Sequence, residues 1–418
     1  MEIKKTSIIY KLLMNNKLIK YLYFFLIQFC LVSCLVNNEE SNYEFNSEPP
    51  ELYKPLRKPM LAAYLHIGTR KIEPEKINLY GVDLINIAFT KITNNKIQLL
   101  YPNHSEEFKK VKEIKKNNPG LRVLVSVGGY GTSDQFSKMA STKSNRTIFV
   151  KDVVNFLKRY SFDGIDVDWE FPGMNKNTRD FERENFTLLL TELKNELDSA
   201  SRQDGKKYLL TIAAGAFDAY LSYTEPQKIT PLVDYFFVMT YDFVGQWNKT
   251  TGHHTNLYKS ILKPYGYSVD RIVKKYISCG IPSDKIIVGC AAYGRQWNDV
   301  DSSETGLFVK GKGIGSISYK KILELENSPN FKKGWDKSAF APYLYSPKNK
   351  IFITYDNSHS IRRKVDYVDI HSLGGIMYWE YYSDGDLKLK NSLVDEIRIN
   401  RGEVLIPQIM QISNIKNR

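Results

Sequence analysis

Residues 162–172 read Phe-Asp-Gly-Ile-Asp-Val-Asp-Trp-Glu-Phe-Pro, and this is the most informative stretch of the chain. Apolar and acidic residues alternate along it, which is the period of a β-strand. Since residues two apart on a strand share a face, Asp166, Asp168 and Glu170 are expected to point the same way. The opposite face is expected to pack into an apolar layer, formed by Ile165, Val167 and Trp169.

Three carboxyl groups on one face of a strand indicate a catalytic site that transfers protons. Buried charges of one sign are costly when they are unpaired. Crowding raises the pKa of at least one such group, so that it holds a proton near neutral pH. The alternative is an exposed acidic edge strand that resists aggregation. Gly164 interrupts the acidic run and Pro172 ends it where a loop would begin, which favours a short strand with catalytic carboxyl groups.

The composition of the 418 residues limits the class of function. An apolar share of 42% can bury one large core or two ordinary ones. The net charge of +13 would suit a nucleic acid, but Lys and Arg are scattered without a dense basic run, so no nucleic-acid partner is expected. The six histidines show no ligand spacing, and we expect no metal and no cofactor. Cys279 and Cys290 are expected to be two buried thiols rather than a bridge.

The N-terminal residues 1–36 have the pattern of an export signal. Lysines precede an apolar run over residues 21–36, which is short for a membrane span. Leu31–Cys34 resembles a bacterial lipobox, in which the cysteine is acylated after cleavage, so Cys34 would become a lipid-anchored N-terminus. An uncleaved anchor or an ordinary secretory signal is the alternative. Residues 37–57 are polar and predict a tether. The protein is expected to be exported, and it would then be either anchored to a membrane, for example at the cell surface, or secreted.

From residue 58 to residue 400 the pattern alternates between strand and helix. Eight runs have the composition of buried strands, namely Met60–His66, Leu84–Thr90, Val123–Val127, Ile165–Glu170, Tyr208–Ala214, Tyr235–Tyr241, Ile286–Ala292 and Gly374–Trp379. Most of the intervals between them are long enough for a helix. Eight strands with helical crossovers are what a (β/α)₈ TIM barrel requires, although a doubly wound sheet fits the same pattern.

The expected strand ends carry aromatic or polar residues almost without exception. Chemistry in a barrel gathers at these carboxyl ends, and aromatic faces combined with polar groups suit a sugar-binding cleft. The candidate substrate-binding residues are Tyr64, Phe89, Gly129, Trp169, Met239, Asp242, Tyr293, Arg295 and Trp379. The candidate catalytic residues are the acids Glu170, Asp168 and Asp166, and Tyr241 stands at the end of the sixth expected strand.

The acidic stretch resembles the D-x-x-D-x-D-x-E signature of the family 18 glycoside hydrolases, the chitinase family, with Asp163 as its first acid. Four further stretches are similar to motifs of that family, namely S-V-G-G at 126–129, M-T-Y-D-F at 239–243, A-Y-G-R at 292–295 and G-G-I-M-Y-W-E at 374–380. Val244 and Ala291 depart from the residues common there. The resemblance favours the barrel over the doubly wound sheet. It also implies an α+β insertion over residues 296–371, between the seventh and eighth strands, and leaves residues 401–418 as a short tail.

The resemblance implies a chitinase that hydrolyses chitin or N-acetylglucosamine oligomers with retention and without a cofactor, as a monomer. Glu170 would be the general acid and base, and the acetamido group of the substrate would be the nucleophile. Asp168, sharing a proton with Asp166, would orient the acetamido N–H, Tyr241 would bind its oxygen, and Trp379 would floor the sugar. Two alternatives stay open: an endo-β-N-acetylglucosaminidase acting on N-glycans, and a non-catalytic chitin-binding lectin.

Overall fold

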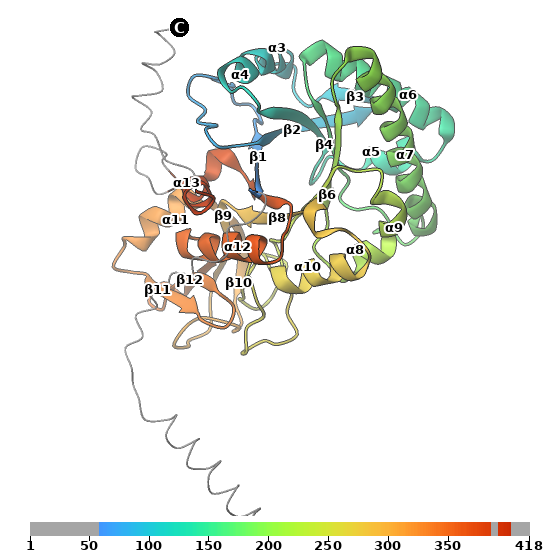
Figure 1. The fold of residues 1–418 in the computed structure, drawn as a ribbon. Coiled ribbons are helices and arrows are strands. Elements are labelled where there is room, and N and C mark those ends of the chain that lie inside the picture. The colour runs from blue at the N-terminus through green and yellow to red at the C-terminus, as the bar shows by residue number, and fades with distance from the viewer. Residues whose placement is uncertain (1–57, 386–391, 403–418) are drawn as a thin grey trace, which may run out of the picture. The chain divides into compact units, whose positions relative to one another are not determined.

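The computed structural model describes residues 58–385 and 392–402, which belong to one unit of the chain, residues 55–418 (Figure 1). The expected signal peptide with Cys34, the tether, and residues 403–418 of the tail lie outside the described residues. Within the described ranges, no helix is both long and apolar enough to cross a membrane.

Eight parallel strands close into a barrel. They follow the order β1-β14-β8-β7-β6-β5-β4-β2, and β2 pairs with β1 to complete the ring. The strands are β1 (Met60–His66), β2 (Leu84–Thr93), β4 (Arg122–Gly128), β5 (Gly164–Asp168), β6 (Leu209–Ala214), β7 (Tyr235–Val238), β8 (Ile286–Ala291) and β14 (Gly375–Trp379). A short strand β3 (Lys96–Leu99) is added antiparallel to β2. The predicted (β/α)₈ barrel is therefore confirmed.

The barrel strands are buried on both faces, which explains why their sequences are nearly continuous apolar runs. Ile165 and Val167 of β5 point outward and pack in the largest apolar cluster, between the strands and the helices. Ala62, Leu124 and Phe237 belong to a second cluster that fills the barrel interior. The strand period thus separates two layers, and polar side chains are left to gather at the strand ends.

Helices cover the outside of the barrel, and the longest are α6 (Lys143–Tyr160) and α7 (Arg179–Asp204) (Figure 1). Thr142 caps α6 by accepting a hydrogen bond from the backbone N–H of Asn145. The other helices are α3 (His104–Lys109), α4 (Val111–Asn117), α5 (Gln135–Ala140), α8 (Asp218–Tyr223), α9 (Pro226–Ile229), α10 (Val269–Ser278), α12 (Ser358–Ile370) and α13 (Leu393–Asn400), with 3₁₀ turns at Ser283–Lys285 and Tyr381–Ser383.

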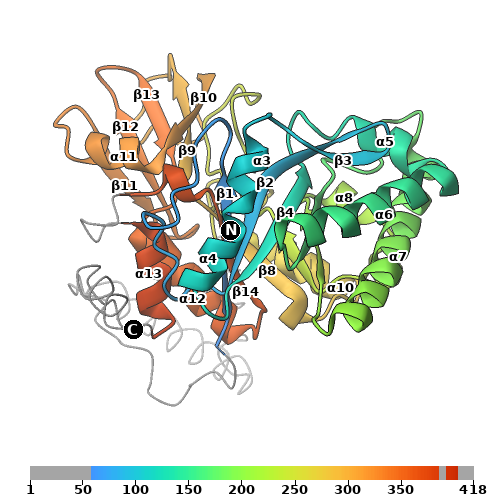
Figure 2. The same cartoon turned by 90° about the horizontal axis from the view of Figure 1, so that it is seen from above.

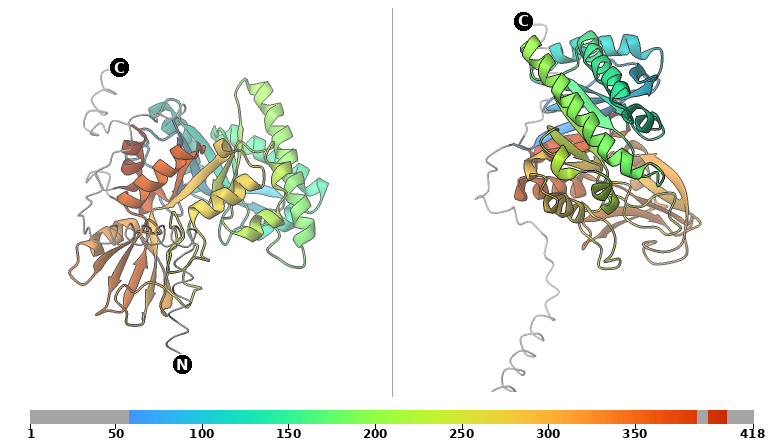
Figure 3. Two further views of the ribbon diagram at one scale, coloured as in Figure 1. Left: turned by 60° about the horizontal axis from the view of Figure 1, so that its bottom comes forward. Right: turned by 90° about the vertical axis from the view of Figure 1, so that its right-hand side faces the viewer.

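An antiparallel sheet is inserted between β8 and β14, and it stands beside the barrel on the side away from α6 and α7 (Figures 2 and 3). Its strands follow the order β10-β9-β13-β12-β11. They are β9 (Tyr293–Asn298), β10 (Lys312–Ser318), β11 (Lys332–Asp336), β12 (Ala341–Ser346) and β13 (Ile351–Thr354), with helix α11 (Tyr319–Glu326) between β10 and β11.

The insertion differs from the expected range of 296–371 at both ends. The sheet already begins at Tyr293, because β9 follows β8 with only Ala292 between them. The sheet ends at Thr354, and the next helix, α12, packs on β8, β14 and α13. Helix α12 is therefore a barrel helix rather than part of the insertion.

The two cysteines of the barrel do not form a bridge. Cys290 is fully buried in β8, and Cys279 is half-buried at the end of α10. The expectation of two thiols is confirmed, although only one of them is fully buried.

Candidate active site

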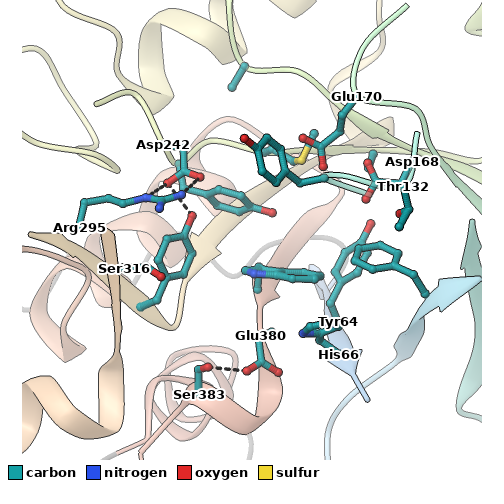
Figure 4. Close-up of a pocket in the computed structure, with 18 of the residues that line it drawn as sticks. Tyr64, His66, Thr132, Asp168, Glu170, Asp242, Arg295, Ser316, Glu380 and Ser383 are labelled. Carbon is teal, nitrogen blue, oxygen red and sulfur yellow. Dashed lines mark hydrogen bonds and ion pairs between the residues drawn. The ribbon is translucent and has the colours of Figure 1, made fainter. Parts of the chain in front are cut away.

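A cleft of about 1050 Å³ opens at the carboxyl ends of the barrel strands (Figure 4). Strands β1, β2, β5 and β14, the loop after β7, and the inserted strands β9 and β10 all contribute to its walls. Because the insertion supplies Arg295 and Ser316, it forms one wall of the cleft, as Figure 4 shows.

Asp166 lies beneath the cleft and is fully buried. Its Oδ2 accepts hydrogen bonds from Tyr64 Oη at 2.9 Å and Ser126 Oγ at 2.8 Å, and its Oδ1 accepts one from Thr211 Oγ1 at 2.7 Å. Burial raises the pKa of Asp166, and the three hydroxyl donors act against that rise. Three donors on one carboxyl group favour its ionised form, so Asp166 is the member of the acidic row best able to carry the charge.

Asp168 is the next acid of the row and lines the cleft. Its pKa is raised well above the usual value by burial first, and then by the nearby charges of Glu170 and Asp166. Its Oδ1 is buried and has no hydrogen-bond partner among the described residues. Burial and these two neighbouring charges therefore favour the protonated form of Asp168.

Glu170 lies at the end of the row and also lines the cleft. Burial, with a smaller contribution from the charge of Asp242, raises the pKa of Glu170 to about 7. Its backbone N–H donates to Ser133 Oγ at 3.1 Å, which fixes the turn that carries the side chain. A carboxyl group with a pKa near neutrality can both donate and accept a proton under ordinary conditions.

Asp242 is the opposite case, across the cleft from Glu170 (Figure 4). It pairs with Arg295, whose Nε lies 2.7 Å from Oδ1, and Tyr293 Oη donates to Oδ1 at 2.8 Å. His254 Nδ1 lies 3.6 Å from the same oxygen. Burial alone would raise the pKa of Asp242, but the interactions with His254 and Arg295 outweigh burial and lower it. Asp242 is therefore a carboxylate at neutral pH.

Trp379 forms an aromatic floor at the end of β14. Its ring stacks on Phe89 with a centroid distance of 5.5 Å and an interplanar angle of 24°, and on His66 at 5.6 Å and 29°. Gly129 lies under Phe89, because a Cβ atom at Gly129 would stand 2.5 Å from that ring. Glu380 follows Trp379 and is held by hydrogen bonds from Ser383 Oγ and the backbone N–H of Tyr382.

The structure brings most of the predicted site residues together. Those that line the cleft are Tyr64, Phe89, Asp168, Glu170, Met239, Tyr241, Asp242, Tyr293, Arg295 and Trp379. Asp166 lies buried beneath the cleft, and Gly129 lies against the ring of Phe89, which lines the cleft.

The prediction that Trp169 binds substrate is corrected by the structure, because Trp169 does not line the cleft. Its ring stacks on Phe136 at 5.2 Å and 7° and meets the edge of Phe186 at 5.8 Å, inside the core under the helices. The strand period places it in that layer, and its inclusion among the substrate-binding residues was wrong.

Asp163, the first acid of the signature, lies at the far end of β5 from the cleft. Its Oδ2 accepts a hydrogen bond from the backbone N–H of Val123 at 3.0 Å, and its Oδ1 lies 2.5 Å from Lys115 Nζ. It therefore ties α4 and β4 to the start of the catalytic strand and takes no part in the cleft.

Several residues at the site were not predicted. Among them are His66, Ser126, Tyr130, Thr211, Gln246, Trp247 and His254. Ser126 and Thr211 could have been found, because they stand on the strands beside β5 in register with Asp166. His254 lies in a loop with no periodic pattern, so the sequence offers no signal for it.

A buried ion pair holds the loop that carries Tyr241 and Asp242. Lys364 Nζ of α12 lies 2.6 Å from Asp356 Oδ2 and 2.7 Å from Thr255 Oγ1. Thr255 Oγ1 in turn donates to the backbone carbonyl of Thr240 at 3.0 Å. The pair therefore links a barrel helix to the backbone next to Tyr241. In the described parts of the chain, no cluster of three or more His, Cys, Asp or Glu side chains is arranged to hold a metal ion.

Comparisons with known proteins identify the family of the chain. The model of the glycosyl hydrolases family 18 matches residues 61–384. Chitinase A1 of Niallia circulans is 36% identical over 303 residues, which cover 68% of this chain and 43% of that protein. The chain therefore spans less than half the length of this relative.

Solved structures show the same fold. A family 18 N-acetylglucosaminidase from Paenibacillus barengoltzii matches with a TM-score of 0.74 and 35% identity, covering 82% of this chain and 99% of that one. A chitinase-like agglutinin from Robinia pseudoacacia matches with a TM-score of 0.72 and 26% identity, covering 82% and 99%. On the match to the family model and the shared barrel, this chain belongs to glycosyl hydrolase family 18.

Proposed function

We propose that this chain is a chitinase, which hydrolyses β-1,4 linkages between N-acetylglucosamine units in chitin and its oligomers. The observation that carries the proposal is the acidic row at the end of β5. There burial raises the pKa of Glu170 to about 7, and burial also raises the pKa of Asp168, which follows the hydrogen-bonded Asp166 on the strand. A general acid must hold its proton at working pH and still be able to release it.

In the first step Glu170 donates its proton to the glycosidic oxygen. The bond between that oxygen and the anomeric carbon breaks while the acetamido oxygen of the same sugar forms a bond to the anomeric carbon. Such an intramolecular attack has a large proximity advantage, with effective molarities of about 10⁵–10⁸ M in well-oriented systems. Asp168, whose Oδ1 is free of other partners, would receive the acetamido N–H, and Tyr241 would bind the acetamido oxygen.

In the second step Glu170, now a carboxylate, takes a proton from water. The water oxygen attacks the anomeric carbon from the face that the leaving group has vacated, and the acetamido oxygen departs. Two inversions at one carbon give net retention, and Glu170 regains its proton. Trp379 offers an apolar face under the reacting sugar throughout.

Two alternatives compete with this proposal. A lectin on the same barrel is a real option, because one structural neighbour is named a chitinase-like agglutinin. The presence of Glu170 with a raised pKa argues for catalysis, since a lectin has no use for a proton donor at this position. An endo-β-N-acetylglucosaminidase acting on N-glycans would share the acidic row, and the aromatic floor of Trp379, Phe89 and His66 does not separate the two substrates.

The test is product analysis with two substrates. Chitohexaose labelled at its reducing end and a glycoprotein with N-linked glycans are incubated with the full chain, and products are separated by mass spectrometry. We expect shorter acetylated oligomers from chitohexaose and an unchanged glycoprotein. Release of glycans with chitohexaose left intact would favour the endo-glycosidase, and no turnover of either substrate would favour the lectin.

A further inference from the structure

One loop of the barrel carries large apolar side chains that stand out from the surface. It lies between β7 and α10, where Ile261 is 79% exposed, Leu262 is 67% exposed and Tyr265 is 92% exposed. Soluble domains rarely expose apolar side chains in a group unless the group binds something. Residues 261–265, which read Ile-Leu-Lys-Pro-Tyr, form the apolar tip of this loop.

The backbone of the apolar tip has most of its hydrogen-bond donors satisfied inside the protein. The N–H of Ile261 donates to Ser338 Oγ at 3.0 Å, and the N–H of Leu262 donates to Ser260 Oγ at 3.2 Å. The N–H of Lys263 donates to the carbonyl oxygen of Ser260 at 3.1 Å. An unpaired N–H group is costly in an apolar medium, so these bonds lower the cost of moving the tip out of water.

The second half of the tip is satisfied in the same way. Pro264 has no N–H group that would need an acceptor. The N–H of Gly266, directly after the tip, donates to the carbonyl oxygen of Lys263 at 3.3 Å. Arg271 Nη1 lies 3.3 Å from the carbonyl oxygen of Tyr265 and 3.4 Å from that of Gly266. The tip is therefore a preformed turn that presents apolar side chains rather than open backbone groups.

Lysine side chains flank the apolar tip without acidic partners. Lys259 and Lys263 lie on either side of the two aliphatic residues, and Lys337 precedes the serine whose hydroxyl group holds the tip. All three are exposed, and none forms an ion pair among the described residues. Residues 256–267 contain no acid, and the nearby Asp336 has a side chain only 7% exposed. The surface around the tip is therefore positively charged.

This combination favours a lipid surface over a protein as the partner of the loop. Side chains that protrude as far as these would each need a matching pocket on a protein. A bilayer takes protruding aliphatic side chains among its acyl chains and holds tyrosine rings at the level of the headgroups. Anionic headgroups in addition attract lysines close to the surface. The charge of the three lysines therefore complements a membrane that contains anionic lipids.

We propose that the apolar tip, with Lys259 and Lys337 beside it, docks this domain on the surface of a bilayer with anionic headgroups. Three inserted side chains and three charges give reversible binding rather than permanent anchoring. Tyr267, two residues beyond the tip, lines the cleft, so docking places one edge of the cleft beside the bilayer. The inference requires neither the acylation of Cys34 nor the proposed hydrolysis.

The first test measures co-sedimentation of the full chain with vesicles of phosphatidylcholine alone and of equal parts phosphatidylcholine and phosphatidylglycerol. Every protein carries Cys34→Ala, so that no acyl group at this position contributes. The tip variant adds Ile261→Ser with Leu262→Ser. Its matched control adds Phe181→Ser with Ile370→Ser, which replace apolar residues of α7 and α12 that are 72% and 68% exposed. All variants should keep the Tm of the background protein.

We expect the tip variant to bind the mixed vesicles about tenfold more weakly than its control, because partial burial of two aliphatic side chains is worth at least that much. The control should bind as the background protein does. A tip variant that binds as tightly as its control would overturn the inference and leave a protein as the partner of the loop.

A second pair of variants tests the role of charge. Lys259→Gln with Lys263→Gln removes two unpaired cations, and Lys109→Gln with Lys321→Gln is the control, since these exposed lysines pair with glutamates on their own helices. The first variant should lose about fivefold per lysine on the mixed vesicles and nothing on phosphatidylcholine alone. Equal losses on the two kinds of vesicle, or equal losses in the two variants, would contradict docking on anionic headgroups.

A further measurement locates the loop directly, because residues 1–36 carry an apolar run of their own and are present in every protein. Tyr265→Trp and Phe181→Trp are compared on mixed vesicles whose acyl chains are brominated and therefore quench tryptophan. The emission added by Tyr265→Trp should be quenched, and the emission added by Phe181→Trp should not. Equal quenching of the two, or no quenching of either, would overturn the inference however tightly the full chain binds.

Discussion

Glu170 and Asp242 are two carboxyl groups in one cleft, and their surroundings move their pKa values in opposite directions. Glu170 is partly buried and has no cationic partner among the described residues, so its pKa rises to about 7. Asp242 is also partly buried, but Arg295 and His254 hold its pKa below the usual range. A pair of carboxyl groups with divergent pKa values is the usual basis for assigning the acid in a hydrolytic site. These opposite shifts make Glu170 the better candidate for a proton donor and keep Asp242 negatively charged near neutral pH.

The first prediction concerns proton donation. Glu170→Gln keeps the shape of the side chain and removes its proton, so kcat on chitohexaose should fall by about 10²–10⁴, the contribution of a positioned general acid. An aryl glycoside of N-acetylglucosamine oligomers, whose leaving group needs no proton, should lose far less. A steady-state comparison of the two substrates is the measurement. Equal losses on both would indicate that Glu170 does something other than protonate the leaving group.

The second prediction concerns pH. Because the pKa of Glu170 is raised in the folded state, the folded protein binds this proton more tightly than the unfolded chain does. Stability from this group is thus fully present below the unfolded pKa, about 4.5, and is lost as pH rises through about 7. The difference in Tm between Glu170→Gln and the wild type should grow in favour of the variant over this window. A difference that stays constant between pH 4.5 and pH 8 would contradict the raised pKa.

Individual residues could be predicted from the sequence where a strand period constrains them. Asp166, Asp168 and Glu170 were placed on one face by alternation alone, and the structure brings all three to one end of β5. The same alternation put Trp169 in the packed layer, where it lies, and only its addition to the substrate-binding residues failed. His254 could not be found, since it lies in a loop and reaches Asp242 through tertiary structure alone.

At the scale of elements, the barrel strands and the presence of the insertion were predictable, but the boundaries of the insertion were not. Buried strands such as β1 carry uninterrupted apolar runs, and the predicted start and end of β1 agree with the structure. The boundary of the insertion was missed because Ala292 alone separates β8 from β9, so no turn residue marks the change of sheet. Helix α12 was misassigned because an amphipathic helix looks the same whether it covers a barrel or an inserted sheet.

The third prediction concerns the ion pair that connects α12 to the loop after β7. Lys364→Ala would leave Asp356 buried and without its cation, and removal of one partner of a buried pair costs about 3–5 kcal/mol. Lys274→Ala is the control, since Lys274 forms an exposed pair with Asp270 and such pairs contribute about 0.3–0.5 kcal/mol. Urea unfolding of both variants measures the difference. A loss for Lys364→Ala no greater than that of the control would show that the pair does not hold the loop.

At the scale of the whole molecule, residues 1–36 have the sequence pattern of an export signal, which bears on where the enzyme acts. We propose that Cys34, which lies outside the described residues, is acylated and anchors the protein to a membrane. The fourth prediction is that Cys34→Ala releases the protein from the membrane fraction or leaves it unprocessed. Mass spectrometry of the wild type, together with membrane fractionation of both proteins, makes the test. A wild type without acyl groups, or a variant that fractionates as the wild type does, would refute the anchor.

The proposed mechanism depends on the substrate as nucleophile, because the other carboxyl groups around the cleft already have partners among the described residues. Glu380 accepts hydrogen bonds from Ser383 Oγ and from the backbone N–H of Tyr382. Asp166 is committed to three hydroxyl groups, and Asp242 is committed to Arg295. Burial and the neighbouring charges favour the protonated form of Asp168, and a protonated carboxyl group is a poor nucleophile. Each of these assignments predicts that the acetamido group of the substrate is indispensable.

The most direct measurement is the turnover by the wild-type protein of chitohexaose and of the fully deacetylated hexamer under the same conditions. We expect cleavage of the acetylated hexamer with retention of configuration. We expect no detectable cleavage of the deacetylated hexamer, because it lacks the acetamido oxygen that would attack the anomeric carbon. Comparable rates on the two hexamers would contradict the proposed mechanism and would make Asp168 the covalent nucleophile.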